Sequence, residues 1–413
     1  MKITICLFLL CTNMFAYAQS YEGVKPDFSP IDITFAGGAP TYLHEVEIRD
    51  TSREGYHPQM IGNQLSFAGL AREAMVAFEG DGPVMGMDTA RYTRFVDSFH
   101  AVAAVPSILA DAERHEIVIV NEAHHEPRHR IFTRMLLQGL YDRGYRHFGL
   151  ETLANYAGAD SLLAAMPYPT TASGYYTRDP GFAAMVQAAR DIGFDIFGYE
   201  AGHKLGNEPR HRETEQMMNI VAYREAHPEG KLLLHVGYSH ANEGELGGSW
   251  GRAMAQRLAD TTGLDPLTIN QTHFRESADT LRERYEYRAA ASALTEPSLF
   301  VNAAGEHWNF DNEVRWFDRY VFHPRTVYRH GRPDYVFSFG RQPVYLDLFG
   351  IDLDGPYLLQ AYGPEDDMTQ AVPRDVIETS EGNERALALV PGSYRVVVIG
   401  ADRAQRVAEI RVD

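Results

Sequence analysis

Four short runs in the middle of the chain carry residue types used in acid–base catalysis. They hold Glu122 with His124 and His125, then Glu151, then Glu200 with His203, and finally His240. A neutral imidazole accepts a proton from water near neutral pH, and a neighbouring carboxylate orients the ring and stabilises the imidazolium. The Gly-x-Ser-x-Gly run at 247–251 does not directly follow an expected strand, as a nucleophile elbow would, so a serine nucleophile is not expected. The runs predict hydrolysis by an activated water.

Each of these runs follows a short apolar stretch typical of a buried strand. Five such stretches lie at 116–120, 147–150, 195–199, 231–236 and 266–269, and helical periodicity lies between them at 128–143, 180–192, 209–227 and 249–262. This alternation predicts an α/β fold with a largely parallel central sheet flanked by helices. Ligands bind beyond the carboxyl ends of such strands, so we expect the acids and imidazoles to share one edge.

Several other polar residues near these strand ends are weaker candidates. His129 lies near a first helical turn, and Arg212 lies on a helix where it could simply form a surface pair. Arg134 falls opposite the apolar stripe of its helix, so periodicity alone predicts a solvated residue. We assign substrate binding to His124, His129, Glu200, His203 and Arg212.

The order of these motifs resembles the erythromycin esterase-like proteins. The matching runs are Asn121-Glu122-Ala123-His124-His125, Phe148-Gly149-Leu150-Glu151, Arg212 to Asn219 and Leu234 to His240. The wider superfamily includes the haem-binding ChaN proteins and the Tiki/TraB proteases. The resemblance covers roughly 116–272 and implies the same α/β fold for that region.

The resemblance also implies roles for particular residues. It makes Glu122 and Glu151 the two acidic residues, His125 the general base and Arg134 an active-site arginine. It makes His240 the last histidine of the later motif. By spacing alone, the choice between His124 and His125 as the base stays open.

The sequence also departs from the family's pattern. Asn121 replaces the leading glycine, Glu126 replaces a glycine, and His129 stands where the family has a glutamate. Gly237 stands where the first histidine of the later motif belongs. We therefore expect an exported hydrolase acting on an ester or related bond of a small-molecule substrate other than a macrolide.

Two alternatives involve a bound metal or cofactor. The histidines and glutamates would suffice for zinc, but the spacing does not match His-Glu-x-x-His, and Pro127 interrupts His125 and His129. Haem or iron binding of the ChaN type is the non-enzymatic alternative, and a metal-dependent hydrolase or protease of the Tiki/TraB type is another. We expect no metal ligands and no cofactor, with zinc or haem as the alternatives.

The regions outside the motifs suggest five segments. These are a signal peptide at 1–18, an extension at 19–55, the catalytic region at 56–294, an aromatic connecting segment at 295–344 and a small β-sandwich-like domain at 345–413. The extension contains a strand-like alternation at 31–35, and helical spacing covers 60–78 and 89–114. The last segment alternates apolar and polar residues, which predicts antiparallel strands.

Composition and the first residues indicate the compartment and exclude some partners. Lys and Arg total 38 against 56 Asp and Glu, giving a net charge of −18, so nucleic acid is not an expected partner. A basic start, an apolar run and Ala16-Tyr17-Ala18 predict a secretory signal, and hence a periplasmic or extracellular protein. Both cysteines lie within that signal, and no later stretch predicts a transmembrane anchor.

Overall fold

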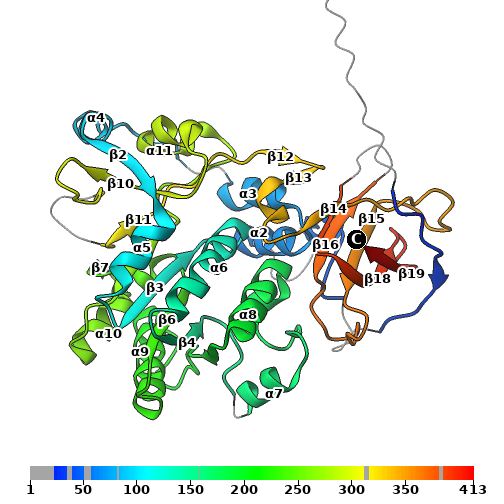
Figure 1. Ribbon diagram of the computed structural model, residues 1–413, viewed down its shortest axis with the longest axis horizontal. Coiled ribbons are helices and arrows are strands. Elements are labelled where there is room, and N and C mark those ends of the chain that lie inside the picture. The colour runs from blue at the N-terminus through cyan, green and yellow to red at the C-terminus, as the bar shows by residue number, and fades with distance from the viewer. Residues whose placement is uncertain are drawn as a thin grey trace, which may run out of the picture.

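The computed structural model describes residues 23–34, 40–50, 57–80, 83–156, 158–310, 316–380 and 385–413. Figure 1 shows an α/β region on one side and an antiparallel β region, containing the C-terminus, on the other. The predicted signal peptide lies outside the described residues. Within the described ranges, no helix combines the length and hydropathy needed to cross a bilayer.

A parallel sheet forms the centre of the α/β region. Its strand order is β11-β9-β3-β6-β4-β5, and every neighbouring pair is parallel. The strands are β3 (Ile117–Glu122), β4 (Tyr145–Leu150), β5 (Asp195–Gly198), β6 (Lys231–Gly237), β9 (Leu267–Asn270) and β11 (Arg319–Tyr320). The five predicted strands are all present. The sixth, β11, comes from the segment that the sequence analysis left as a connection.

Helices cover both faces of this sheet. One core joins Val118, Val120 and Leu233 to α5 (Ala104–Ala112), α6 (Pro127–Tyr141) and α8 (Pro180–Ile192). A second core joins Ile117, Ile119 and Leu232 to α9 (Pro209–Ala226) and α10 (Met254–Thr262). Alternate residues of a strand face opposite sides, so these largely apolar strands are buried on both faces.

The predicted helices are present with three corrections. The segment predicted at 60–78 is interrupted at 68–70, between α2 (Pro58–Phe67) and α3 (Ala71–Glu79). Residues 251–252, expected to be helical, form β8 (Gly251–Arg252), which pairs with β7 (Glu245–Gly247). The predicted helix at 89–114 is wrong in its middle, because α4 (Thr89–Ser98) and α5 are separated by β2 (Phe99–Ala103). β2 pairs with β10 (Ser298–Asn302), a partner that local periodicity does not reveal.

Antiparallel strands make up the β region. The larger sheet has the order β1-β19-β18-β15-β16, and β14 pairs with β17. Their bounds are β1 (Ser29–Pro30), β14 (Gln342–Val344), β15 (Tyr357–Tyr362), β16 (Asp375–Thr379), β17 (Leu387–Leu389), β18 (Gly392–Ile399) and β19 (Gln405–Val412). Only β1 is a strand near the alternation predicted at 31–35; residues 31–34 are not in a strand, and Phe35 lies outside the described residues.

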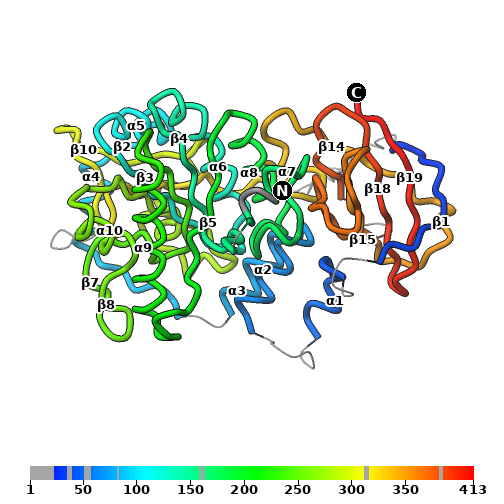
Figure 2. Tube along the Cα trace, turned by 90° about the horizontal axis from the view of Figure 1, so that it is seen from below, coloured from blue at the N-terminus to red at the C-terminus, as the bar shows by residue number. Residues whose placement is uncertain are grey.

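Shorter elements connect these layers. Figure 2 shows the first helices on one side of the molecule, where the two regions meet. The remaining elements are α1 (Glu45–Ile48), α2 (Pro58–Phe67), α3 (Ala71–Glu79), α7 (Ala159–Ala165), α11 (Tyr285–Ala290), β12 (Tyr328–Arg329), β13 (Arg332–Pro333) and the 3₁₀ turns η1 (Tyr176–Arg178), η2 (Tyr238–Ala241), η3 (Thr280–Arg282), η4 (Ala291–Ala293) and η5 (Asp334–Phe337).

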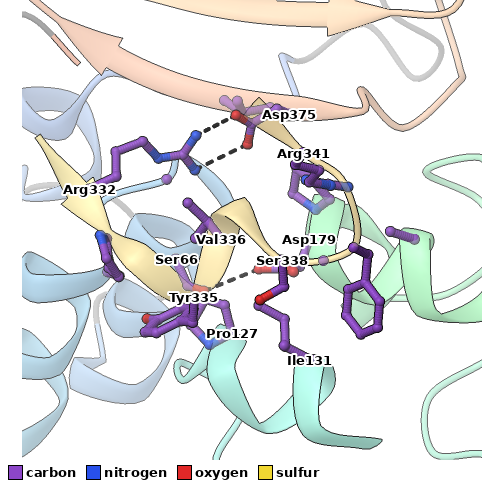
Figure 3. A pocket seen from close by; sticks show the side chains of 18 of the residues that line it. Ser66, Pro127, Ile131, Asp179, Arg332, Tyr335, Val336, Ser338, Arg341 and Asp375 are labelled. Atoms are coloured by element: carbon purple, nitrogen blue, oxygen red, sulfur yellow. Dashed lines mark hydrogen bonds and ion pairs between the residues drawn. The ribbon is translucent and has the colours of Figure 1, made fainter. Parts of the chain in front are cut away.

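The β region shares a core with the α/β region. Leu358 and Val397 belong to the core that contains α6 and α8, whereas Leu359 and Val398 belong to a core within the β region. Arg332 of β13 also pairs with Asp375 of β16 at the junction, as Figure 3 shows. Strands β15 and β18 are therefore buried on both faces, which fixes the β region against the α/β region.

Candidate functional site

Three neighbouring strands deliver the predicted residues to one edge of the sheet. β6 lies between β3 and β4, so Gly237 at its end is flanked by Glu122 on one side and by Glu151 on the other. His240 follows in η2, and Arg212 reaches the same place from α9. The structure brings together Glu122, His124, Glu151, Glu200, Arg212 and His240, whereas His125 has other partners.

Glu122 and His124 form a directed pair. Nδ1 of His124 donates to Oε1 of Glu122 at 2.8 Å, and both side chains are buried. The imidazole stacks on the ring of Tyr176, with 3.9 Å between centroids. No described residue hydrogen-bonds Nε2 of His124. The ring is therefore held in one orientation with a nitrogen left available.

A buried network holds Glu122 in place. Arg130 donates to it from Nε at 2.8 Å and from Nη2 at 3.0 Å, and Nε2 of His235 lies 2.9 Å from its Oε2. Burial alone would raise the pKa of Glu122, but the charges of Arg130 and His235, with hydrogen bonds from His124 and His235, hold it well below its usual range. Glu122 is therefore an anion beside His124.

His125 lies in a different environment from His124. Its Nδ1 is 3.3 Å from the Tyr238 hydroxyl, its Nε2 is 3.1 Å from Nη1 of Arg275, and its ring stacks on Phe78. Burial and the positive charge of Arg275 hold the pKa of His125 well below its usual range. Both nitrogens are engaged, so the geometry favours His124 over His125 as a base.

Gly237 gives His124 its space and binds Glu151. A β-carbon added at Gly237 would collide with Cε1 and Nε2 of His124 and would lie 3.1 Å from Oε2 of Glu151. The amide of Gly237 donates to that same oxygen. The missing side chain therefore leaves room for the imidazole against the second acid.

Glu151 connects the histidine pair to a second charged group. Its Oε1 accepts from Nη2 of Arg212 at 2.6 Å, and Arg212 also binds both oxygens of Glu200. Burial alone would raise the pKa of Glu151, but His240, His124 and Arg212 lower it to about 2. Arg212 is only partly buried, so this group opens toward solvent.

His240 lies between Arg212 and Glu213. Its Nδ1 is 2.7 Å from Oε1 of Glu213, and its Nε2 is 2.8 Å from Nη1 of Arg212. Burial lowers the pKa of His240, whereas Glu151 and Glu213 raise it above its usual value. The two carboxylates therefore favour a protonated ring, whose Nδ1 donates to Glu213.

Sequence reasoning missed several residues of this site. Tyr176 stacks on His124, and no described residue hydrogen-bonds its hydroxyl. Burial, with the charges of Glu151 and Glu122, raises the pKa of Tyr176, so its phenol stays protonated and able to donate. Glu213 and His235 lie within the motifs that resemble the family, but the sequence analysis gave them no role. Tyr176 begins the 3₁₀ turn η1, which carries no motif.

Three predicted residues lie away from the cluster. His129 is fully buried, where its Nδ1 accepts from the Ala123 amide at 2.9 Å, which is a structural contact. Arg134 lies over the ring of Phe339 at 4.0 Å, on a face of α6 turned to the β region. His203 is exposed on the loop after β5. The structure gives these three no part in the cluster.

The described residues do not fit a metal centre. No group of three His, Cys, Asp or Glu side chains among them has the geometry to hold a metal ion. The nitrogens of His125 and His240 and Nε2 of His235 already have protein partners. The part of the chain that the structure describes therefore offers the zinc alternative no ligand set.

Comparison with known proteins gives no family. Neither a protein-family model nor a curated protein sequence matches this chain. The type III effector HopBA1 is 14% identical with a TM-score of 0.29, over 45% of this chain and 93% of its own. RRSP, a MARTX toxin effector domain from Vibrio vulnificus, is 14% identical with a TM-score of 0.29, over 56% and 50%.

A haem-binding protein shows a similarly weak likeness. The structure of ChaN of Campylobacter jejuni with cofacial haem is 10% identical with a TM-score of 0.28, over 46% of this chain and 95% of that chain. Similarities this weak carry no argument about what this chain binds or does. The site must therefore be interpreted from its own geometry.

Proposed function

We propose that this protein is an exported hydrolase that cleaves an ester or a related bond with water activated by the Glu122–His124 pair. One observation carries the proposal: His124 donates through Nδ1 to a buried carboxylate and leaves Nε2 without a partner. This is the arrangement in which a carboxylate fixes the tautomer of a histidine base. The motif resemblance to the erythromycin esterase-like proteins supports the same chemistry.

The charges around Glu122 suit the formation of an imidazolium. Arg130 binds both Glu122 and Asp179, the latter at 2.9 Å from Nη1. Two carboxylates thus share one guanidinium in a buried place. Because Coulomb interactions are strong where water is excluded, these carboxylates favour the transfer of a proton from water to His124 during the reaction.

The proposed reaction needs one base and one donor. Nε2 of His124 takes a proton from water as the water oxygen attacks the carbonyl carbon. The Tyr176 hydroxyl donates to the resulting oxyanion, because its raised pKa keeps it protonated. The carbon–oxygen bond to the leaving group then breaks, and the imidazolium returns the proton to the departing alkoxide. The products are a carboxylic acid and an alcohol.

The test is a panel of ester and lactone substrates with adjacent histidines as matched controls. We expect His124→Ala to lose roughly 10²- to 10⁴-fold in kcat/KM, the usual contribution of a general base. His125→Ala should lose much less, and Tyr176→Phe should lower kcat with little effect on KM. Equal turnover by wild type and His124→Ala, with circular dichroism showing both folded, would reject this mechanism.

The same free nitrogen favours one alternative function. If haem were bound, an imidazole that donates through Nδ1 to a carboxylate, as His124 does, could serve as a ligand to its iron. Titration with haem separates the two possibilities. A Soret shift that is present in wild type and lost in His124→Ala, without turnover of any ester, would favour haem binding over hydrolysis.

A further inference from the structure

A cleft separate from the catalytic cluster lies between the α/β region and the β region. It has a volume of about 520 Å³ and is lined by α6, α8, Tyr168, Tyr394 and the segments around Phe339 and Leu389. Clefts of this size hold small molecules. Neither Glu122 nor any residue contacting it in the catalytic network lines this cleft.

Three arginines line this cleft, and two of them have no carboxylate partner among the described residues. Arg134 lies over Phe339, and Nη1 of Arg341 reaches only the Ala388 carbonyl at 3.4 Å. Arg374 pairs with Asp366 at 3.0 Å. Burial and the charge of Arg341 lower the pKa of Arg134, as expected for two cations placed together.

The negative charge in the cleft does not balance these arginines. Asp191 is the one carboxylate among the described residues lining it, and it already accepts from Gln187 at 2.7 Å. In a chain with a net charge of −18, two cations held together with a single carboxylate in the lining are a costly arrangement. An anion entering the cleft would offset this repulsion, and guanidinium groups bind oxyanions through paired hydrogen bonds.

The rest of the lining is largely apolar. Ile192, Ala188 and Leu389 contribute aliphatic surface, and Tyr168 and Tyr394 contribute aromatic rings. Figure 3 shows Arg341 among the residues that line the adjoining pocket. A ligand in this cleft would contact both regions of the protein, with its charged end near Arg134 and Arg341.

We propose that this cleft binds a small ligand made of an oxyanion group, phosphate or carboxylate, attached to an apolar body. Arg134 and Arg341 bind the oxyanion, and the aliphatic and aromatic lining contacts the apolar body. This site is independent of the proposed hydrolysis, and its occupant bridges α6 and the β region. The resemblance placed Arg134 in the active site, whereas its position here assigns it to a second site.

Calorimetric titration of the full chain tests the site with four probes. Phenyl phosphate and benzoate carry an oxyanion on an apolar ring, inorganic phosphate lacks the ring, and phenol lacks the charge. We expect phenyl phosphate or benzoate to bind more tightly than inorganic phosphate and phenol not to bind. The tighter of the two ring-bearing probes identifies the oxyanion. Binding that is undetectable for both would overturn the proposal.

Charge-neutralising variants locate the bound probe. Arg134→Gln and Arg341→Gln should each weaken binding of the tighter probe by about tenfold or more, as expected for a charge-assisted hydrogen bond. Neither removes an ion pair, so both should remain folded. Arg411→Gln, on an exposed part of β19, makes the same change in net charge elsewhere. If all three variants bound the probe with equal affinity, the probe would not bind at Arg134 and Arg341, and the proposal would be wrong.

Discussion

The imidazole of His124 occupies the position that a side chain on Gly237 would need. A β-carbon there would collide with Cε1 and Nε2 of the ring, and Tyr176 stacks against it at 3.9 Å. The backbone of Gly237 has φ −84° and ψ 139°, which any residue can adopt. Glycine is therefore required by the histidine ring and not by backbone conformation.

This relationship predicts that Gly237→Ala abolishes the proposed hydrolysis without unfolding the protein. The methyl group must displace the His124 ring from Glu122, because that ring is the group in its way. We expect kcat/KM on the best substrate of the ester panel to fall by roughly 10²-fold or more, as for loss of the base. Stability should fall by only about 1–3 kcal/mol, the usual cost of overpacking.

A second glycine provides the control for this variant. Gly202, near the site on the loop after β5, has its nearest neighbour 3.6 Å from an added β-carbon. Gly202→Ala should keep wild-type turnover. If Gly237→Ala also kept it, the position of His124 would have no role in activity.

Asp179 supplies the second carboxylate on Arg130 and offers another prediction. It also begins α8, where its Oδ1 accepts from the Phe182 amide at 3.0 Å. Asn caps helices as well as Asp, so Asp179→Asn should keep the helix while removing the charge. In this variant Arg130 would pair with Glu122 only, and the imidazolium of His124 would lose a nearby anion. We therefore expect kcat to fall by at least about tenfold.

The control for this variant is Ser66→Ala. Ser66 donates to Oδ2 of Asp179 at 3.1 Å without carrying charge, as Figure 3 shows. Its loss should lower the melting temperature slightly and leave kcat nearly unchanged. A wild-type kcat in Asp179→Asn would show that this carboxylate has no effect on the base.

Much of the scaffold was predictable because it depends on local pattern. The inner strands are mostly apolar on both faces, so apolar runs such as 231–236 identify them. Glu122 is the last residue of β3, and Glu151 directly follows β4. Parallel strands place their carboxyl ends at one edge, which predicts that these acids lie near His240.

The remaining features depend on contacts between distant parts of the chain. β2 forms because β10 pairs with it. The residues at 99–103 carry no sequence pattern that indicates this partner strand. Our proposal of His124 over His125 as the base rests on the contact of His124 with Glu122 and of His125 with Arg275. Tyr176 reaches the site from a loop, so no motif could have identified it.

Acid should destabilise the protein through Glu151. Its pKa is about 2 in the fold, below the value of an unfolded glutamate, so its contribution is complete above pH ~4.5 and is lost as the pH falls toward 2. The shift corresponds to on the order of 3 kcal/mol. Glu151→Gln should flatten the pH dependence of unfolding free energy in that window.

Exposed Glu245 is the control, because it forms a surface pair with Arg252. Glu245→Gln should keep the wild-type slope in urea titrations between pH 5 and 2.5. A wild-type slope in Glu151→Gln would show that the charges around Arg212 do not stabilise the fold.

Glu243 should make the folded protein less stable as the pH rises, the opposite of the effect of Glu151. Burial and the neighbouring Asp318 raise its pKa to about 8, and its Oε1 accepts from the Thr268 hydroxyl. A raised pKa means that the folded protein keeps a proton that the unfolded chain releases. This stabilisation is complete below pH ~4.5 and declines by up to about 1.4 kcal/mol per pH unit as the pH rises to 8.

Glu243→Gln should remove this decline, because an amide resembles the protonated acid and has no charge to repel Asp318. We expect the variant to be more stable than wild type at pH 8, as measured by chemical denaturation at several pH values. Glu229→Gln, at an exposed position before β6, serves as the control and should behave as wild type. If Glu243→Gln were instead less stable than wild type at pH 8, the carboxylate form would be the one that the fold prefers, and the paired acids would not share a proton.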